Sequence, residues 1–266
     1  MKHNLLNGKV GILFGALDEN SIAWKTALKV HEAGGKFVLS NAPIALRLGK
    51  IKELAAITGS EIIAADATDV EALKVLITQA QEILGGKLDF VLHSIGMSPN
   101  VRKEKAYTDL NYDFFQKTID ISALSLHKVL QVCYQQNALN SWASVVALTY
   151  IAAQRTYPQY SDMAEAKAML ESIARSFGYH YGKKNNVRIN TISQSPTATT
   201  AGSGVSGFDT FFDYANKMSP LGNATAEGCA DYVVALFSDL TRFVTMQNLY
   251  HDGGYSSMGM SENVMG

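Results

Sequence analysis

The sequence predicts an α/β protein: a single doubly wound, Rossmann-type domain with about seven parallel strands flanked by helices. The first observation behind this prediction is a regular alternation of short apolar runs with longer amphipathic stretches along the whole chain. Continuously apolar strands are typical of parallel sheets, because helices cover both faces of such a sheet. The second observation is that no Pro/Ser-rich linker separates the two halves of the 266 residues. We therefore expect residues 1–266 to form one domain.

The predicted strands and helices follow one another in a single series. Seven apolar runs predict strands, and these lie at residues 9–14, 36–40, 61–65, 88–94, 144–150, 187–193 and within 244–254. Apolar residues at helical spacing predict the helices between them, at residues 21–34, 44–59, 69–86, about 111–137, 159–181, 208–217 and 226–240. Strands that alternate with helices in this way indicate βαβ units and a parallel sheet.

Composition and charge exclude several classes of function. The formal net charge is −1, so nothing in the overall balance indicates a nucleic-acid partner or an anionic membrane surface. The two cysteines, Cys133 and Cys229, lie in apolar helical stretches and are expected to be reduced core thiols. The six histidines are scattered without ligand spacing, so no metal site is expected. His93, at a strand end, is expected to be a structural hydrogen-bonding residue. Without a secretion signal or a membrane-length apolar run, we expect a cytoplasmic protein that does not insert into membranes.

Three strand ends carry residues suited to a dinucleotide. After the first strand, Gly15 opens a turn that leads to Ser21 at the start of a helix, whose N-terminal amides suit a pyrophosphate. The usual G-x-G-x-x-G spacing is absent, so a plain turn capped by Ser21 fits these residues equally well. Asp66 follows the third strand, where a carboxylate suits an adenine edge, and HSIG (93–96) forms a small-residue turn after the fourth. Because ligands bind at the carboxyl ends of parallel strands, we expect these turns to form one cofactor site.

The second strand leaves the choice of nicotinamide cofactor open. It ends in Ser40-Asn41-Ala42-Pro43, without the acidic residue that binds the ribose 2′-hydroxyl of NAD in many Rossmann proteins. Arg47 is the nearest basic residue, and it can either meet the 2′-phosphate of NADPH or point into solvent. We predict NADH as the cofactor, with NADPH not excluded.

The segment TYIAAQRTYPQYSDMAEAK (149–167) holds three tyrosines and, at its end, a lysine. Tyr160 and Lys167 are seven residues apart, which predicts that they project from one face of a helix, two turns apart. Tyr157 precedes a proline and is expected in the loop before that helix, while Tyr150 ends a strand nearby. A free phenol titrates near pH ~10, and an adjacent ammonium stabilises developing phenolate charge. Tyr160 is therefore the main candidate for a proton donor, with Lys167 beside it.

On these residues the chain resembles a known family. A Tyr-x6-Lys pair in a Rossmann-type chain is the mark of the short-chain dehydrogenase/reductases. Within that superfamily the details resemble the NAD(P)H-dependent enoyl-acyl-carrier-protein reductases of bacterial fatty acid synthesis. The resemblance runs over nearly the whole chain, and the two tyrosines ten residues apart, Tyr150 and Tyr160, are a specific part of it. The matching stretches are G-x-x-x-x-x-SIAW (15–24), HSIGMSP (93–99), LTYIAAQRTYPQY and M–AKAMLES within 148–172, VRINTIS (187–193) and DGGYS (252–256).

The resemblance implies a reaction and a site. Hydride from a reduced nicotinamide is expected to add to the β-carbon of a trans-2-enoyl thioester, and the charge to move to the thioester oxygen, where a hydrogen-bond donor lowers the barrier. Tyr160 matches that donor, Lys167 matches the residue that holds the nicotinamide ribose, and Tyr150 matches a second tyrosine that orients the substrate. The family's cofactor contacts fall on Gly15, Ser21, Ile22, Asp66, Ala67, Ser94, Ile95, Gly96, Lys167, Pro196, Thr197 and Thr199.

The resemblance also implies a lid and partners. Residues 197–218 correspond to the family's mobile substrate lid, and their glycines suit a loop that orders on binding. The enoyl thioester is expected on acyl carrier protein, and the chain is expected to assemble as a homotetramer. Two departures concern cofactor contacts: QSP (194–196) stands where many relatives have a glycine before the proline, and Thr197 stands where isoleucine is common.

Two other functions share parts of this pattern. A carbonyl or alcohol oxidoreductase of the same superfamily would also use Tyr160 and Lys167. Such enzymes carry a T-G-x-x-x-G-x-G turn and a serine in the catalytic strand, where this chain has Thr149 and Tyr150. A non-catalytic nucleotide-binding paralogue usually lacks the tyrosine or the lysine, and both are present. The sequence therefore favours an enoyl thioester reductase.

Overall fold

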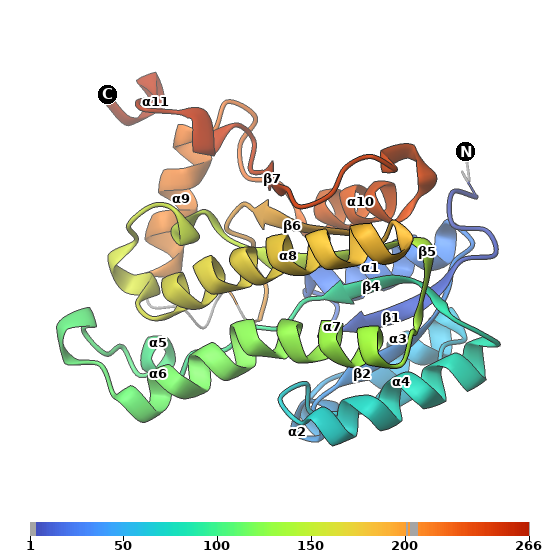
Figure 1. Ribbon diagram of the computed structural model, residues 1–266. Helices are drawn as coiled ribbons and strands as arrows, with labels where there is room; N and C mark the ends of the chain where they lie inside the picture. The colour runs from blue at the N-terminus through green and yellow to red at the C-terminus, as the bar shows by residue number, and fades with distance from the viewer. Residues whose placement is uncertain (1–3, 201, 203–206, 266) are drawn as a thin grey trace.

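The protein forms one seven-stranded sheet in which all neighbouring strands are parallel (Figure 1). A computed structural model describes residues 4–200, 202 and 207–265 of the chain. The strands are β1 (Val10–Phe14), β2 (Lys36–Asn41), β3 (Ile62–Ala64), β4 (Leu88–His93), β5 (Leu139–Thr149), β6 (Arg188–Gln194) and β7 (Asn248–His251). Their order in the sheet is β3-β2-β1-β4-β5-β6-β7, which confirms the predicted doubly wound α/β fold.

Helices cover both faces of the sheet (Figure 1). They are α1 (Ile22–Glu32), α2 (Pro43–Leu48), α3 (Ile51–Thr58), α4 (Val70–Leu84), α5 (Pro99–Arg102), α6 (Tyr112–Ile119), α7 (Ser125–Gln135), α8 (Met163–Asn185), α9 (Phe208–Met218), α10 (Ala226–Phe237) and α11 (Glu262–Met265). One apolar core lies between the sheet and α1, α3 and α10, and a second lies between the sheet and α4, α7 and α8.

The two cores explain why the strands are apolar throughout. In β1, Ile12 belongs to one core and Leu13 to the other, and in β4 the same is true of Val91 and Leu92. All four side chains are at most 1% exposed. Because successive strand residues point to opposite faces, both faces need apolar residues, and each such buried side chain stabilises the fold by roughly 1.5–3 kcal/mol.

The order of the strands places a ligand-binding crevice beside β1. From β1 the chain adds β2 and β3 on one side, and it then crosses to place β4 against the other side of β1. The loops that follow β1 and β4 therefore start side by side at the same edge of the sheet, and the chain continues from them toward opposite sides of the sheet. In open α/β sheets this switch point at the carboxyl ends of the strands is where ligands bind.

One predicted helix is interrupted, and another runs without a break but contains a π-helical segment. Residues 44–59, expected as one helix, form α2 and α3 because the chain is extended at Gly49 (φ −100°, ψ 176°). A Cβ at Gly49 would lie 2.6 Å from the carbonyl oxygen of Leu17, so the loop after β1 approaches too closely for a side chain there. Residues 111–137, expected as one long helix, form α6 and α7 with the π-helical segment Asp120–Leu124 between them. Such segments frequently occur at functional sites.

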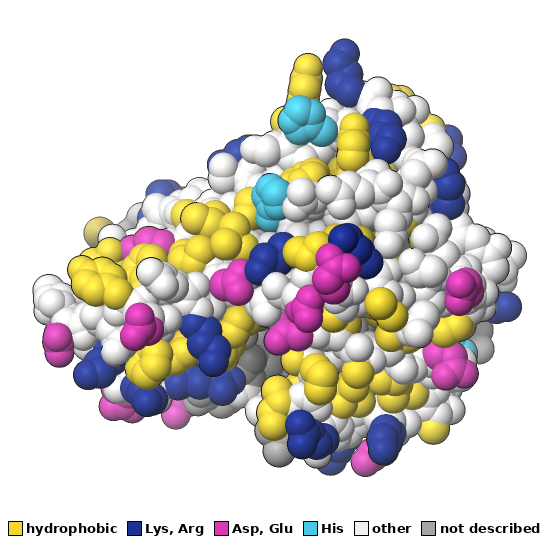
Figure 2. Space-filling view, turned by 60° about the horizontal axis from the view of Figure 1, so that its bottom comes forward, with side chains coloured by type: hydrophobic (Ala, Val, Ile, Leu, Met, Phe, Trp, Pro, Cys, Tyr) yellow, Lys and Arg dark blue, Asp and Glu magenta, His cyan; other side chains and the backbone are white. Residues whose placement is uncertain are grey.

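Charges of both signs mix on the surface, and both cysteines are buried in the core. On the face that Figure 2 shows, Lys and Arg side chains are interspersed with Asp and Glu. Cys133 and Cys229 are free and buried, and burial raises the pKa of each thiol to about 12, so both are core thiols as predicted. None of the described helices has the length and apolarity that a membrane crossing requires. Over the same residues, no group of three or more His, Cys, Asp or Glu side chains is placed to hold a metal ion.

Gly15 makes the close approach of the β1 and β4 loops possible. Its φ is +96°, and a Cβ there would lie 2.0 Å from the carbonyl oxygen of Ser94. We expect Gly15→Ala to lower the free energy of unfolding by about 2 kcal/mol or more, because it adds both backbone strain and a steric clash. Urea unfolding at fixed protein concentration measures this loss. At Gly86 a Cβ meets no atom within 4 Å, so Gly86→Ala is the control, and an equal loss in both variants would contradict the prediction.

Candidate active site

The turns that follow β1 and β4 touch at the carboxyl edge of the sheet. Phe14 pairs with His93 at the ends of the two strands, and Gly15 lies directly against the Ser94 backbone. Ser94 and Ile95 continue from β4 half-buried, and Gly96 is exposed. Gly15 and Gly96 form a cradle of small residues where an extended ligand can lie close to the backbone, so these residues fit the passage of a dinucleotide.

The N-terminus of α1 opens onto the same edge. Ser21 caps this helix: its hydroxyl accepts hydrogen bonds from the amides of Trp24 and Leu17, each at 3.3 Å, and donates to the carbonyl of Asp18 at 2.8 Å. Ile22 is the first helical residue and is half-buried. The backbone amides of the first turn carry partial positive charge, so this end of α1 fits a pyrophosphate.

The ends of β2 and β3 form the adenosine side of the site. Asp66 is exposed, and its Oδ1 accepts hydrogen bonds from the amide and hydroxyl of Thr68 at 2.9 and 2.7 Å. Ala67 beside it is buried. Asn41 uses its amide inside the protein, because Nδ2 donates to the carbonyl of Ala16 at 3.0 Å and Oδ1 accepts from the next backbone amide at 2.9 Å. Arg47 lies exposed on α2.

The loop after β6 reaches the same site from the other side. Thr197 Oγ1 donates to the carbonyl of Ser195 at 2.9 Å, and Thr199 Oγ1 accepts from the amide of Gly202 at 2.9 Å. The next residue, Thr200, donates a hydrogen bond to Asp18 in the loop after β1. A cavity of about 250 Å³ lies between these loops, and its lining includes Asn20, Pro196, Thr197 and Thr225. The cofactor residues expected after β1 and β6 are therefore neighbours.

Tyr160 and Lys167 do not share a helix, and this part of the prediction is wrong. Tyr160 ends the 3₁₀ turn Pro158–Tyr160, whereas α8 begins only at Met163. Between them Ser161 takes φ 46° and ψ −138°, a backbone conformation that interrupts any helix. Both residues instead lie against the end of β5, where the Tyr160 ring contacts Tyr150 and Lys167 binds the carbonyl of Leu148. The spacing of seven residues along one helix does not produce this arrangement.

Lys167 lies buried under the turn that follows β4. Its Nζ donates a hydrogen bond to the carbonyl of Leu148 near the end of β5 at 2.9 Å, and a Cβ placed on Gly96 would lie 3.5 Å from this nitrogen. Burial lowers the pKa of Lys167 to about 8, and the nearby carboxylate of Glu171 opposes that shift. At neutral pH the side chain is thus an ammonium group within reach of any ligand held by the β4 turn.

Tyr150 is the centre of a tyrosine cluster at the end of β5. It is 7% exposed, and its ring centroid lies 5.0 Å from that of Tyr160 and 5.2 Å from that of Tyr157. Its hydroxyl is buried and has no hydrogen-bond partner among the described residues. Burial raises the pKa of Tyr150 and of Tyr160, so both phenols keep their protons at neutral pH and remain hydrogen-bond donors.

His93 has the structural role expected for it. Its Nε2 lies 2.8 Å from the hydroxyl of Ser125, which in turn donates to the carbonyl of Ile121 in the π-helical segment at 2.6 Å. Burial, assisted by the positive charge of Lys167, lowers the pKa of His93 to about 3. The ring stays neutral through the physiological range, and it ties β4 to the helix that crosses below it.

Sequence analysis missed three residues of the site. Glu171 is 4% exposed and accepts hydrogen bonds from Thr149 Oγ1 at 2.9 Å and from Asn248 Nδ2 at 3.2 Å, so it joins β5, β7 and α8. Its spacing of four residues from Lys167 was an available signal. Tyr157 donates a hydrogen bond to the hydroxyl of Tyr255 at 2.5 Å across 98 positions of sequence. Only the DGGYS match pointed to Tyr255, and nothing local pairs it with Tyr157.

Comparisons with known proteins agree with this arrangement. A family model described as "Enoyl-(Acyl carrier protein) reductase" matches residues 15–256. The chain is similar to "Enoyl-[acyl-carrier-protein] reductase [NADH] 2" of Rhizobium meliloti (strain 1021), with 33% identity over 261 residues that cover 97% of this chain and 95% of the relative.

Solved structures extend the similarity to three dimensions. A crystal structure of a FabI–NADH complex from Alistipes finegoldii is 61% identical with a TM-score of 0.98, and it covers 98% of this chain and 93% of that chain. A crystal structure of enoyl-[acyl-carrier-protein] reductase (NADH) from Aquifex aeolicus VF5 is 31% identical with a TM-score of 0.88, over 96% of this chain and 99% of that chain.

The lowered pKa of Lys167 predicts a pH-dependent contribution to stability. The folded chain releases this proton near pH 8, before the unfolded chain does near 10.5, so the free energy of unfolding rises with pH across this interval. Between pH 7 and 9.5 we expect that of the wild type to rise by about 2 kcal/mol relative to Lys167→Met, measured by urea unfolding without cofactor. Taking the difference cancels the cysteines and tyrosines that titrate nearby. The exposed Lys52→Met is the control, and a pH-independent difference for Lys167→Met would refute the assignment.

Proposed function

The chain belongs to the enoyl-(acyl carrier protein) reductase family, and we propose that it reduces the trans-2 double bond of enoyl thioesters on acyl carrier protein in bacterial fatty acid elongation, with NADH as the hydride donor. One feature of the structure is the main support for this proposal. The buried hydroxyl of Tyr150 has no partner among the described residues and lies in the cluster that contains Tyr160. A buried polar group without a partner needs an explanation, and a substrate oxygen supplies one.

The carboxyl edge of the sheet fits the cofactor. The cradle formed by Gly15 and Gly96 lies between the N-terminus of α1 and the ammonium group of Lys167. When bound, the reduced nicotinamide supplies the hydride that adds to the β-carbon of the substrate. The residues proposed to hold the cofactor are Gly15, Ser21, Ile22, Asp66, Ala67, Ser94, Ile95, Gly96, Lys167, Pro196, Thr197 and Thr199.

The tyrosines and the lysine act on charge and protons. As the β-carbon gains hydride, negative charge develops on the thioester oxygen, and Tyr160 donates a hydrogen bond to that oxygen. A proton then taken up at the α-carbon completes the saturated thioester. Tyr150 orients the same end of the substrate from the adjacent ring. Lys167 holds the nicotinamide ribose and adds a positive charge in a site where low solvent exposure strengthens its effect. Removing one preorganised donor of this kind typically lowers kcat by about 10²–10³.

NADH is proposed over NADPH because of the end of β2. Asn41 uses both ends of its amide for contacts within the protein, which leaves the nearby Arg47, exposed on α2, as the candidate for binding a 2′-phosphate. An exposed arginine on a short helix binds a phosphate weakly because solvent screens the interaction. The relatives named above carry NADH in their names, which supports the same choice.

Residues 197–218 are proposed as a substrate lid on a single catalytic domain that spans residues 1–266. Three aromatic residues on α9 pack together, with ring centroids of Phe208 5.1 Å from Phe211 and 5.6 Å from Phe212. Residues 201 and 203–206 of this segment lie outside the described residues. An amphipathic helix with an aromatic face, after a loop tied to Asp18 by Thr200, suits a cover for an acyl chain.

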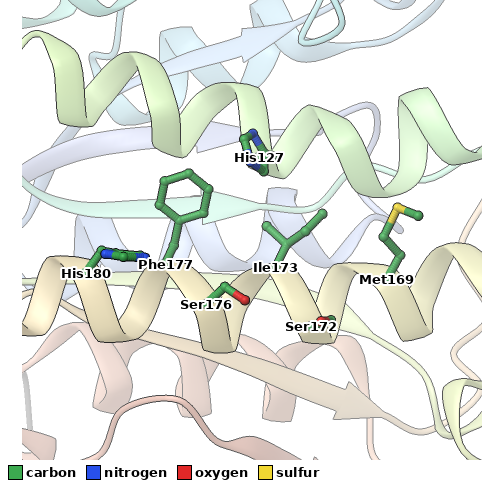
Figure 3. A pocket seen from close by; sticks show the side chains of 7 residues that line it. All are labelled: His127, Met169, Ser172, Ile173, Ser176, Phe177 and His180. Carbon is green, nitrogen blue, oxygen red and sulfur yellow. The ribbon is translucent and has the colours of Figure 1, made fainter.

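A homotetramer is proposed on the outer face of α7 and α8. A cavity of about 380 Å³ lies on this face, and its lining is His127, Met169, Ser172, Ile173, Ser176, Phe177 and His180. Figure 3 shows Ile173 and Phe177 pointing from α8 toward α7. The small Ser172 and Ser176 allow another helix to approach closely, and Met169 is 38% exposed.

We also propose that the enzyme acts in the cytoplasm, where NADH is regenerated.

The reductase assignment is tested by the loss of nicotinamide absorbance with a trans-2-enoyl thioester. We expect Tyr160→Phe to lower kcat by about 10²–10³, Lys167→Ala to lower kcat and raise the KM for NADH, and Tyr150→Phe to have the smaller effect. NADPH in place of NADH should lower kcat/KM by about tenfold or more, because its 2′-phosphate has to lose solvation beside β2 with only the exposed Arg47 to pair with it. Controls are Tyr112→Phe, with Tyr112 78% exposed, and Lys52→Ala.

Two outcomes would contradict the assignment. Turnover of a β-ketoacyl thioester or a simple ketone without enoyl turnover would make the chain a carbonyl reductase. Tight NADH binding without any turnover would make it a nucleotide-binding protein.

The assembly prediction is tested by light scattering after size exclusion. We expect a mass four times the 28.9 kDa chain, and a lower mass for Ser176→Arg, because a charged side chain in the α7/α8 groove loses its solvation on assembly. Lys52→Glu, on the opposite face at α3, should remain tetrameric. A tetramer that survives Ser176→Arg would place the interface elsewhere.

A further inference from the structure

Asp162 is a fully buried acidic residue that the proposed chemistry does not use. It is 0% exposed. Its Oδ1 accepts a hydrogen bond from Ser98 Oγ at 2.6 Å, and its Oδ2 accepts from Asn100 Nδ2 at 2.8 Å and Thr118 Oγ1 at 2.9 Å. Within the described part of the chain, no Lys, Arg or His nitrogen lies within 4.0 Å of this carboxylate. Neutral donors alone therefore satisfy it.

The three donors come from the opposite wall of the site. Ser98 is the N-cap of α5, Asn100 lies within α5, and Thr118 lies on α6, at sequence separations of 64, 62 and 44 from Asp162. Removing the carboxylate would leave these three donors buried without partners. This would lower the free energy of unfolding far more than the loss of one exposed hydrogen bond does. The start of α8 is thus tied firmly to the segment that follows β4.

The residue before Asp162 is strained. Ser161 takes φ 46° and ψ −138°, which glycine adopts readily and other residues avoid. Its side chain does not offset this strain, because Ser161 Oγ is buried and has no hydrogen-bond partner in the part of the chain that the structure describes. The local sequence favours a helix at this position, since the pattern over residues 159–181 predicts one that includes Tyr160. Contacts outside the turn must therefore keep Ser161 in this conformation. The strongest of these contacts are the three hydrogen bonds that Asp162 accepts.

We propose that Asp162 is a positioning residue of the reductase: it keeps the Ser161 turn from joining α8 and thereby holds the Tyr160 ring beside Tyr150. The inference rests on the proposed function for its catalytic consequence only. If α8 extended by one turn, the backbone of Tyr160 would rotate into the helix, and its ring would leave its position 5.0 Å from Tyr150. Lys167, about one turn into α8, would stay bound to the carbonyl of Leu148.

The kinetic test separates positioning from general stability. We expect Asp162→Asn to lower kcat for a trans-2-enoyl thioester by about tenfold or more, because one amide hydrogen then faces the donors of Asn100 and Thr118. The KM for NADH should stay within about twofold, since Lys167 is unmoved. Adding Ser161→Gly should restore most of kcat, because glycine removes the strain that the weakened anchor no longer holds.

A matched control uses another carboxylate with backbone and amide donors. Asp89 accepts hydrogen bonds from the amide of Val10 and from Asn140 Nδ2, both at 2.9 Å, at the amino end of the strands. Asp89→Asn should lower stability and leave kcat unchanged. If Asp162→Asn keeps its kcat, or loses it without recovery on Ser161→Gly, Asp162 serves stability alone and the proposal fails.

A crystal structure of Asp162→Asn gives a reading that does not depend on activity. The proposal expects α8 to begin near Tyr160 and the Tyr160 ring to have left Tyr150, and it is overturned if the Ser161 turn is unchanged. Wild-type protein that fails to reduce enoyl thioesters would refute the proposed function, whereas the structure of the variant would still decide the role of Asp162.

Discussion

The contact between Gly15 and the Ser94 backbone is the constraint on which the site depends. It exists because β1 and β4 pair in register at the switch point of the sheet, so that their loops leave the same edge side by side. The two apolar cores fix that register, since a slip of one residue would turn Ile12 and Leu13 into the wrong cores. The other elements of the site surround this contact between the two loops. The N-terminus of α1 faces it, and Lys167 lies beneath it.

Burial sets the chemistry of the charged and phenolic groups. It raises the pKa values of Tyr150 and Tyr160, which keeps them as donors, and it lowers that of Lys167 to about 8, which leaves the lysine charged at neutral pH. Glu171 limits the shift of Lys167 and holds Thr149 and Asn248 at the same time. The site thus combines phenol donors that keep their protons with one lysine that is still charged at neutral pH, which is the arrangement that stabilises a developing oxyanion.

Helix α8 serves two surfaces. Its inner face carries Lys167 and Glu171 against the sheet, where both are buried. Its outer face carries Met169, Ser172 and Ser176 along the groove shared with α7. The tie from Asp162 to α5 and α6 stiffens the beginning of the same helix.

The sequence by itself determined the sheet, the ligand edge and the residue types of the site. Continuous apolar runs require helices on both faces, and Gly15, Asp66 and HSIG (93–96) stand at strand ends because the chain turns there. These signals are local, so periodicity and turn chemistry reveal them. The tertiary structure alone decided where helices stop: Gly49 breaks one because Leu17 approaches it, and Ser161 breaks another because Asp162 is held by groups 44 to 64 residues away. Helix propensity over residues 159–181 favours a helix that includes Tyr160 and Ser161. The helix does not form there because several buried hydrogen bonds contribute more free energy than the helix propensity of one turn.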